Sequence, residues 1–443
     1  MEQVTGADLD SETKKESSLS ASKWLFLICW LVYTCAYIAR VNYSTAIDGM
    51  KTLGVIDENM AGIISSVYFV VYAAGQVVNG IIADRRSPFM LVVLGLTFVS
   101  LSNAAMFLIY SPSWLLMVWW ALNGFGQSML WSPVFFIISN GLNSKVRFMA
   151  ITIISLCTPA GKISGYLFSG ISLSLGGWRG VFVMGSGVIL LMLLLWIAFW
   201  MSLRRDIVFQ RGEKEPEAAK NAEAELPKER MGILRIFTVS GIAIALPSLV
   251  VHGLFLNGAG EWIPSILQSS YGLSDSSAAY LTMIIPAIGA FGVFLCNWVY
   301  AKFRKNEMKT ALFFMAVSML PVIVLYFLTG SEGKLFGATA EAVLFTAMYG
   351  LLYILQLGYS HCLISLIPMR CAIFTLGATV TGINNAVNYF GSALSTYGMS
   401  LAVEHMQMST LMLVWLALLA FATVSVIFSV KPWSRFRSSL GDE

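Results

Sequence analysis

Twelve stretches of mostly apolar residues constrain this chain more than any other feature, because each is long enough to cross a lipid bilayer. A transmembrane helix needs about 20 predominantly apolar residues. Only 12% of the residues are charged, about half the fraction that a soluble globular domain carries. The sequence therefore predicts an all-α membrane protein with twelve transmembrane helices. The predicted spans are residues 24–47, 59–83, 89–110, 113–140, 146–173, 179–201, 236–267, 276–301, 310–329, 337–367, 371–399 and 408–430.

A polar segment divides these spans into two sets of six. Residues 202–235 mix both signs of charge and lack apolar periodicity, so we expect a cytoplasmic linker there. The linker separates an N-terminal bundle, 24–201, from a C-terminal bundle, 236–430, and polar tails occupy 1–23 and 431–443. Many multi-span proteins are built from two related halves with a site between them. We therefore predict two pseudo-symmetric six-helix bundles.

Basic residues are distributed unevenly between the loops. Of the 28 lysines and arginines, 23 lie in the tails, the linker and the loops on their side, whereas Lys51, Arg179 and Lys334 lie on the other side. Loops rich in lysine and arginine stay in the cytoplasm. We therefore predict a multi-pass protein of the cell membrane with both termini in the cytoplasm. Residues 1–23 lack the apolar core of a signal peptide, so the first span should direct insertion.

Arg40 lies at membrane depth in the first span. A charged side chain there costs at least about 2.5–3.5 kcal/mol, so it usually faces a bundle interior or an aqueous cavity. Tyr33, Tyr37, Arg40 and Ser44 are spaced by four, three and four residues and therefore share one helical face. Such a stripe of donors suits an oxyanion. The alternative is an arginine that snorkels to the interface or pairs structurally with a neighbouring helix.

Lys162 is a second cation inside a predicted span. It lies on a small, polar face with Thr158 and Gly165, which again follow helical spacing. A lysine in mid-span marks a pathway unless it is neutral and packed for structure. In the preceding span, Asn123 and Gln127 are four residues apart. They either line a cavity or make hydrogen bonds between helices.

The second half offers a matching polar stripe. Aligning Arg147 with Arg370 places Lys162 opposite Asn385. Asn384 and Asn388 flank Asn385, and we expect these three amides to close over the neutral end of a substrate. His361 is a further candidate, although a lone membrane histidine is more often a packing residue than a proton relay.

Four motifs together resemble those of the organophosphate–phosphate antiporter branch of the major facilitator superfamily, which includes glycerol-3-phosphate and hexose-phosphate transporters, and the resemblance covers nearly the whole chain. The resemblance implies that Arg40 binds a phosphoryl group while Tyr33 and Tyr37 line its cavity. We add Asn42 as a further hydrogen-bond partner for the substrate. The motifs are Tyr33-x3-Tyr37-x2-Arg40-x-Asn42, Gly80-x3-Asp84-Arg85, Gly177-Trp178-Arg179 and Glu261-Trp262-x-Pro264.

The chain departs from that branch at three cationic positions. Leu256 occupies the position of a second arginine, Val41 that of a lysine and Pro159 that of a histidine, and Lys162 follows three residues later. The predicted cavity therefore holds fewer cations than is usual for the branch. Arg40 can still bind phosphate or carboxylate through two parallel hydrogen bonds.

Three functions remain open from the residues. The first, which we favour, is a transporter that moves a phosphorylated metabolite or phosphate by alternating access, with phosphate as a possible counter-substrate. The second is a proton-coupled carboxylate or sugar-acid symporter. The third is a sugar-phosphate sensor of the same fold. We expect Asp84 and Arg85 to act in gating, and Glu261 to pair with Lys162 in the empty site and to take up a proton.

The sequence offers no catalytic or metal site. The six cysteines lie within or beside apolar runs, and no cysteine or histidine spacing suggests a metal. There is no nucleophile–base pair and no phosphate-binding loop. We expect no enzymatic activity, no cofactor, no nucleic acid partner and a monomeric protein, whose partners are a small anion and the lipid bilayer.

Overall fold

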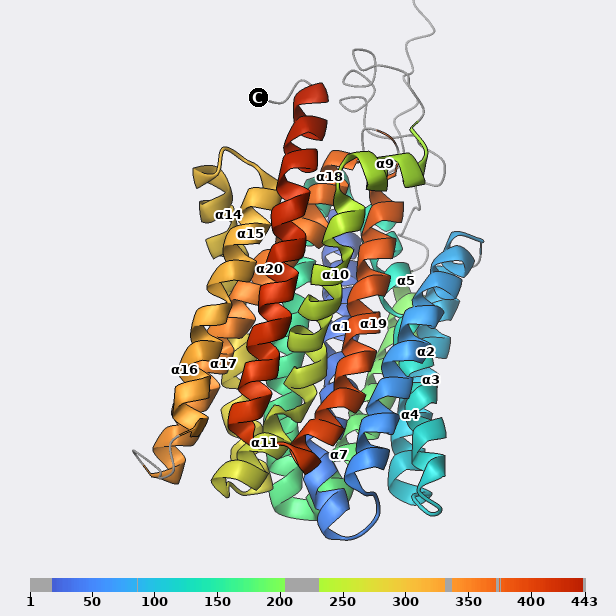
Figure 1. Ribbon diagram of the computed structural model, residues 1–443. Helices are drawn as coiled ribbons and strands as arrows, with labels where there is room; N and C mark the ends of the chain where they lie inside the picture. The colour runs from blue at the N-terminus through green and yellow to red at the C-terminus, as the bar shows by residue number, and fades with distance from the viewer. Residues whose placement is uncertain are drawn as a thin grey trace, which may run out of the picture.

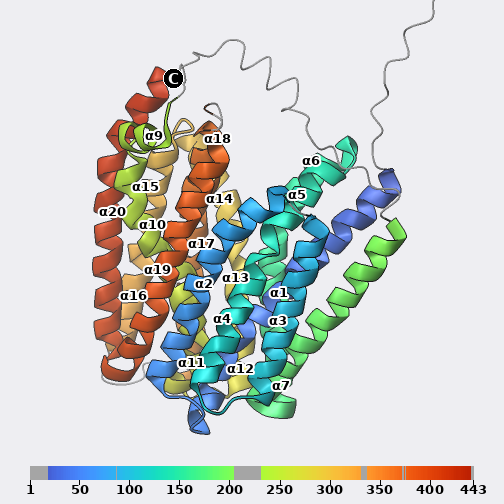
Figure 2. The same ribbon diagram turned by 90° about the vertical axis from the view of Figure 1, so that its right-hand side faces the viewer.

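The computed structural model describes residues 18–85, 87–203, 231–330, 337–371, 374 and 376–440, and these parts contain helices and turns but no strand. Most helices run along one common direction (Figure 1). Both ends of the described chain lie at one end of the bundle, which we call the tail end (Figure 2). The turn at residues 53–57, after the first helix, lies at the opposite end, which we call the loop end. The linker residues 204–230 and the side chains of Asp84 and Arg85 lie outside the described residues.

The first group of helices makes six passes. Gly177 turns the chain back inside α7 with a φ of 60°, a conformation that glycine adopts without steric cost, so this one element contains two passes. α4 continues into α5 after a short break, and α6 and the 3-10 turn η1 lead into α7. The elements are α1 (Leu19–Thr52), α2 (Glu58–Arg85), α3 (Pro88–Leu108), α4 (Trp114–Ser128), α5 (Trp131–Gly141), α6 (Ser144–Ile153), η1 (Ile154–Leu156) and α7 (Cys157–Leu203).

The second group also makes six passes, but most of its helices are interrupted. A short helix, α9 (Ile233–Val239), precedes the first pass. The passes are α10 (Ile242–Gly253) with η2 (Leu254–Ala259) and α11 (Gly260–Tyr271); α12 (Asp275–Thr282) with α13 (Ile284–Gly289) and α14 (Phe291–Lys302); α15 (Glu307–Val317) with α16 (Met319–Gly330); α17 (Ala338–Ser360) with η3 (His361–Leu366) and α18 (Ile367–Cys371); α19 (Gly377–His405); and α20 (Met408–Ser439).

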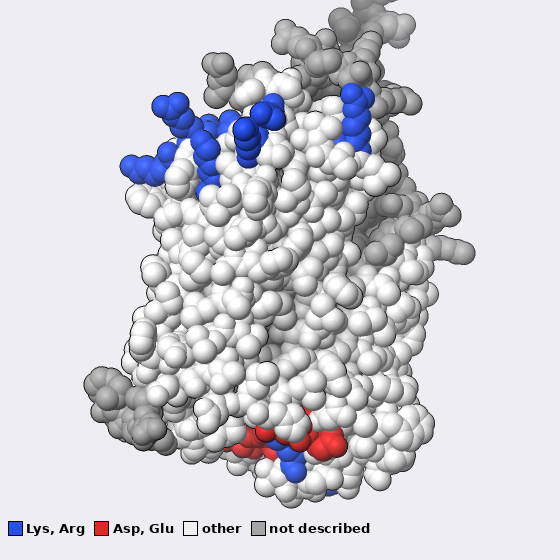
Figure 3. Space-filling model, viewed as in Figure 1, with Lys and Arg blue, Asp and Glu red and all other residues white. Residues whose placement is uncertain are grey.

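The twelve passes confirm the predicted fold class. Among the described residues, eight helices are by themselves long and apolar enough to span a membrane, and one of them, Cys157–Ser202, contains two passes. The remaining three passes are α2, α4 with α5, and α19. Large apolar side chains such as Phe294, Phe327 and Phe428 are 65–70% exposed on the outside of the helices. On the face shown in Figure 3, charged side chains gather at the two ends and leave the middle uncharged, as expected for a protein that crosses a bilayer.

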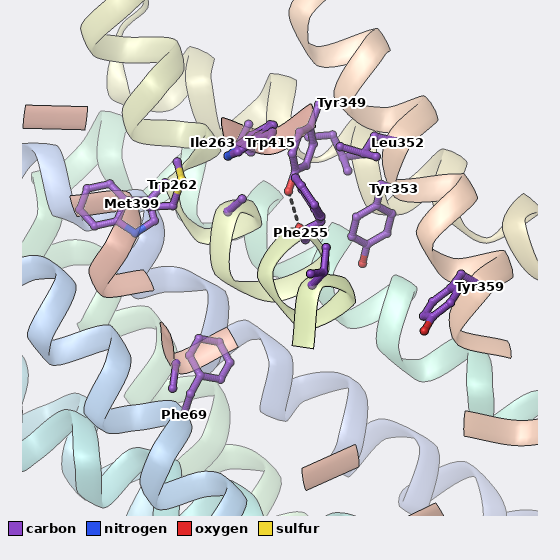
Figure 4. Packing of buried hydrophobic residues seen from close by; sticks show 14 of the residues in the cluster. Phe69, Phe255, Trp262, Ile263, Tyr349, Leu352, Tyr353, Tyr359, Met399 and Trp415 are labelled. Carbon is purple, nitrogen blue, oxygen red and sulfur yellow. Dashed lines mark hydrogen bonds between the residues drawn. The ribbon is translucent and has the colours of Figure 1, made fainter. Parts of the chain in front are cut away.

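The two groups share one hydrophobic core at the loop end. In that core, first-group residues such as Ile47 and Tyr68 belong to the same buried cluster as Trp262 and Trp415 of the second group. Figure 4 shows part of this cluster, with Phe69 of the first group and residues of the second group such as Trp262 and Trp415. Toward the tail end the first group has a core of its own, which includes Leu25. The two groups accordingly diverge toward the tail end (Figure 2).

Polar contacts also join the groups in the loop-end half of the bundle. Ser66 of α2 donates a hydrogen bond to the Ala393 carbonyl of α19 at 2.8 Å. Ser265 of α11 donates to the Asp48 carboxylate of α1 at 3.0 Å. The Lys51 ammonium lies 2.8 Å from that same carboxylate. The structure is therefore held together at the loop end.

Candidate functional site

A small cavity lies where the two groups meet. Both groups contribute to its wall, which contains two cations, one carboxylate, one amide and several phenol rings. The lining residues are Arg40, Val41 and Ser44 of α1, Phe69 of α2, Lys162 and Tyr166 of α7, Leu256 and Asn257 of η2, Gly260 and Glu261 of α11, Thr282 of α12, Ile285 and Pro286 of α13, and Tyr349 and Tyr353 of α17.

Arg40 lies inside the bundle and does not snorkel, since only 5% of it is exposed. Five aromatic rings surround its guanidinium carbon. Cation–π contacts stabilise a charge without using its hydrogen-bond donors. Among the described residues, the guanidinium forms no ion pair and no hydrogen bond, so its donors are available to an anion. The centroid distances are 5.2 Å to Tyr37, 5.5 Å to Tyr68, 5.6 Å to Phe69, 4.9 Å to Tyr72 and 5.8 Å to Tyr389.

Lys162 connects the two groups of helices. Its ammonium donates a hydrogen bond of 3.0 Å to the hydroxyl of Tyr353, which belongs to α17. The ammonium also lies 5.3 Å from the centre of the Tyr353 ring. The ion pair that we expected between Lys162 and Glu261 is not formed in this structure. The partner of the ammonium is thus a neutral hydroxyl. An anion can displace this hydroxyl more easily than it could displace a carboxylate.

Glu261 contributes the one negative charge of the cavity wall. Its Oε2 atom is buried and accepts no hydrogen bond from the described residues. The charges of both Arg40 and Lys162 act on this carboxylate. The cavity therefore has a net charge of about +1 when all three groups are ionised, and binding of an anion must compete with Glu261 for the two cations.

Tyr33 and Tyr37 lie next to this cavity, on the tail side of Arg40, and are not among its lining residues. The Tyr37 hydroxyl accepts a hydrogen bond of 3.4 Å from Thr158. The Tyr33 ring packs on Tyr37 and, at 4.7 Å between centroids, on Trp131. These two phenols extend the polar face of α1 from the cavity toward the tail end.

The predicted amides of the first group hold helices together. Asn42 donates to Asn103 of α3 at 2.7 Å, and Gln127 donates to the Ala36 carbonyl of α1 at 2.7 Å. Asn123 donates to the Ala39 carbonyl at 2.9 Å. Neither Asn42 nor Gln127 lines the cavity. Of the two alternatives given for Gln127 and Asn123, the structure thus shows hydrogen bonds between helices.

The predicted polar residues of the second group also lie outside the lining. Asn384 is fully buried and donates to the Leu363 carbonyl of η3 at 2.8 Å. Asn388 is 4% exposed, Asn385 is half-buried, and His361 is the first residue of η3. Of the ten residues expected to bind substrate, Arg40 and Lys162 line the cavity, together with the coupling candidate Glu261.

The sequence reasoning missed most of the aromatic rings around Arg40 and the amide of the cavity wall. Tyr68 and Tyr72 are four residues apart on α2 and share one face, which is the signal that could have identified them. Tyr389 and Tyr353 come from the second group, and their approach to Arg40 and Lys162 depends on how the groups pack. Asn257 is an isolated amide in an apolar run, and this feature of the sequence could have identified it as a cavity residue.

Comparison with known proteins identifies relatives along the whole chain. A probable hexose phosphate transport protein of Chlamydia pneumoniae is 20% identical and covers 93% of this chain and 90% of its own length. A hexuronate transporter of Bacillus subtilis is 22% identical over 92% of this chain and 94% of its own length. The membrane sensor protein UhpC of Escherichia coli is 28% identical over 25% of each chain.

The fold matches that of solved transporters. The crystal structure of a D-xylose–proton symporter aligns with a TM-score of 0.68 at 14% identity, over 93% of this chain and 97% of the other. The family model of the Major Facilitator Superfamily matches residues 29–396. This chain is therefore a member of the Major Facilitator Superfamily of membrane transporters.

Proposed function

We propose that this transporter moves a small organic anion across the cell membrane, and that Arg40 and Lys162 bind the anionic group. One observation carries the proposal: the buried Arg40 guanidinium lies in a cavity between the two groups of helices and has no carboxylate partner among the described residues. A buried cation that forms no ion pair is costly unless function requires it. A bound anion forms that ion pair.

The chemistry of the two cations supports a phosphate or carboxylate ligand. Arg40 presents a planar fork that matches two oxygens of either group. Lys162 adds a point charge once it leaves the hydroxyl of Tyr353. With Glu261 ionised, the net charge of about +1 suits a monoanion such as a sugar acid. When Glu261 takes up a proton, the net charge of about +2 suits a phosphate ester.

The position of the cavity supports alternating access. Its wall comes from both groups, so a bound substrate would contact both of the units that alternating access moves. A substrate shifts the equilibrium toward the conformation in which it contacts both groups best. We infer that the units that move are the bundles at 24–201 and 236–430, with both termini in the cytoplasm, in accord with the basic residues of the tail-side loops.

Phosphorylated metabolites or phosphate remain our first choice of substrate, with phosphate as counter-substrate. The similarity to a probable hexose phosphate transport protein supports this choice. A proton-coupled sugar-acid symporter is the second candidate, supported by the hexuronate transporter and by the small number of cations. The partial similarity to a membrane sensor protein supports a third, a sugar-phosphate sensor.

Thermal stability of the purified protein tests the anion site. A ligand that binds only the folded state raises the unfolding temperature by mass action. We expect glucose 6-phosphate, inorganic phosphate or glucuronate to stabilise the wild type and to have no effect on Arg40→Ala. If phosphate compounds alone stabilise the wild type, the first candidate holds. If glucuronate alone does, the second holds. Equal stabilisation of Arg40→Ala would contradict the proposed site.

A further inference from the structure

The pass formed by α10, η2 and α11 is opened in its middle by a π-helix at Leu254–Ala259. A π-helix adds a residue to a helical turn, widens the backbone and is found frequently at functional sites. This segment contributes Leu256 and Asn257 to the cavity wall. Its carbonyl groups lie within a membrane-spanning element, where no water is available to bond them.

Two hydroxyls of α19 donate hydrogen bonds to consecutive carbonyls at the junction of α10 and η2. Ser392 donates to the Gly253 carbonyl at 3.1 Å, and Ser395 donates to the Leu254 carbonyl at 3.0 Å. Side-chain hydroxyls from neighbouring helices are the usual way to satisfy irregular backbone in a membrane. A Cβ atom on Gly253 would lie only 1.9 Å from the Asn388 carbonyl oxygen, so glycine is needed for this close approach.

A third hydroxyl bonds the next carbonyl from the opposite side. The Tyr349 hydroxyl of α17 donates to the Phe255 carbonyl at 2.6 Å, as the dashed line in Figure 4 shows. Three consecutive carbonyls, the last of α10 and the first two of η2, are thus each held by a side chain of another helix. This fixes the rotation of the π-helix about its axis and, with it, the direction in which Asn257 points.

Ser392 also fixes which end of the Asn257 amide faces the cavity. The Ser392 hydroxyl has one proton. Its neighbours Gly253 and Asn388 both present carbonyl oxygens, which can only accept that proton in a hydrogen bond. Its oxygen is therefore left to accept, and the Asn257 NH₂ group donates to it at 3.3 Å. Because the NH₂ group is turned to Ser392, the amide oxygen of Asn257 is presented to the cavity.

We propose that Asn257 accepts a hydrogen bond from a hydroxyl of the substrate, and that Ser392 is the residue that positions it. The inference rests on the proposed function and narrows its substrate class: Arg40 and Lys162 hold the anionic group, and Asn257 selects anions that carry hydroxyls. When the ligand is apolar at this position, the Asn257 amide oxygen is left without a hydrogen-bond donor. This cost makes the site favour anions with hydroxyls over anions without them. The site therefore takes polyhydroxylated anions, such as sugar phosphates or sugar acids.

The test compares matched ligand pairs on the purified, full-length protein. Glucose 6-phosphate is paired with cyclohexylmethyl phosphate, and glucuronate with cyclohexanecarboxylate, so that each pair differs chiefly in hydroxyls. We expect the wild type to bind the hydroxylated member of at least one pair roughly tenfold more tightly. Asn257→Leu should bring that ratio close to one, because it weakens binding of the hydroxylated member and relieves the unpaired amide that the hydroxyl-free anion faces in the wild type.

The role of Ser392 is tested with the same ratio. Ser392→Ala should lower the ratio, Ser392→Thr should restore it, and Ser392→Ala should have no further effect in an Asn257→Leu background, because the two residues act through one group. Ser429→Ala is the matched control, since among the described residues the hydroxyl of this buried serine donates only to the Ser425 carbonyl of its own helix, α20. Its ratio should equal that of the wild type.

Two results would overturn the inference in distinguishable ways. If Arg40-dependent binding is found but the wild type and Asn257→Leu show the same ratio, Asn257 does not select hydroxyls and the proposed function stands. If no probe binds in an Arg40-dependent manner, the proposed function fails and the inference fails with it. An equal effect of Ser392→Ala and Ser429→Ala would show that Ser392 does not position Asn257.

Discussion

The two groups of helices contribute different chemistry to the same cavity. The first group provides both cations and most of the rings around Arg40, largely from unbroken helices such as α1 and α2. The second group provides the carboxylate, the amide and Tyr353, and two of its passes contain π-helices. The difference suggests a division of work: the first group contacts the charged part of the ligand, and the second group contacts the rest of it.

The first prediction tests the charge-binding side and has the largest expected effect. Arg40→Ala should weaken anion binding by at least about 30-fold, because a hydrogen-bonded charge pair in a buried site is worth roughly 2–5 kcal/mol. Arg40→Lys should retain part of the affinity, since the charge remains but the planar fork is lost. Isothermal titration calorimetry with the ligand found by thermal stability measures both.

Arg179→Ala is the control for Arg40→Ala. Arg179 also lies over aromatic rings, 4.5 Å from the centre of Tyr110, but it does not line the cavity. Its removal should leave affinity unchanged. A loss of affinity in Arg179→Ala as large as that in Arg40→Ala would mean that the first group does not hold the anion at Arg40.

The second prediction tests the carboxylate of the second group. Ionised Glu261 competes with an anion for Arg40 and Lys162, so binding should weaken as the pH rises and Glu261 loses its proton. Glu261→Gln should bind the anion about tenfold more tightly at high pH, and its transport should lose the pH dependence seen in the wild type. Uptake and affinity measured from about pH 5 to about pH 8 provide the comparison.

Glu404→Gln is the matched control, because Glu404 is exposed at the loop end, outside the cavity. It should keep the pH dependence of the wild type. If Glu261→Gln keeps it as well, Glu261 is not the group that couples transport to protons.

The third prediction concerns the hydrogen bond between the groups. Tyr353→Phe removes the hydroxyl that accepts a hydrogen bond from Lys162. The Lys162 ammonium then binds the anion without first breaking that hydrogen bond. Anion affinity should rise a few-fold, in keeping with a net hydrogen-bond contribution of about 0.5–1.5 kcal/mol. Tyr359→Phe serves as control, because the Tyr359 hydroxyl bonds Ser248 away from the cavity. Unchanged affinity in Tyr353→Phe would show that Lys162 and the ligand do not meet.

The smallest effect is expected at the loop end. Ser265→Ala removes the hydrogen bond to Asp48 and should destabilise the closed loop end by about 1 kcal/mol. Spin labels at positions 53 and 406, one in each group, should then report a larger population of long distances. Ser202→Ala, at an exposed position where the hydroxyl bonds its own helix, should leave the distances unchanged. Identical distance distributions for Ser265→Ala and Ser202→Ala would show that the hydrogen bond from Ser265 to Asp48 does not hold the loop end closed.

The sequence predicted the fold and two of the three charged residues of the binding cavity for the same physical reason. Apolar runs of sufficient length must span, and a charge such as Arg40 or Lys162 inside a run must face the interior. The coupling candidate Glu261 also lies in the cavity wall. The amides were harder to place, since helical spacing gives the face of a residue but not its neighbour. Gln127 therefore faces inward as expected, yet bonds the backbone of α1.

Other parts of the site had no sequence signature that could be interpreted. Carbonyls of both π-helices accept hydrogen bonds from other passes, for example from Tyr349 to Phe255 and from Asn384 to Leu363. Those donors are about 20–140 residues away along the chain, and only tertiary packing brings them together. Tyr389 reaches Arg40 for the same reason, because α19 packs along α2.

Uptake into proteoliposomes tests the central claim most directly. Vesicles that contain the wild type, Arg40→Ala or Arg179→Ala would be compared for uptake of labelled glucose 6-phosphate and glucuronate, with and without internal phosphate or a pH gradient. The account predicts uptake of at least one anion by the wild type and Arg179→Ala and none by Arg40→Ala. Arg40-dependent binding without any uptake would contradict transport and identify the cavity as that of a sensor.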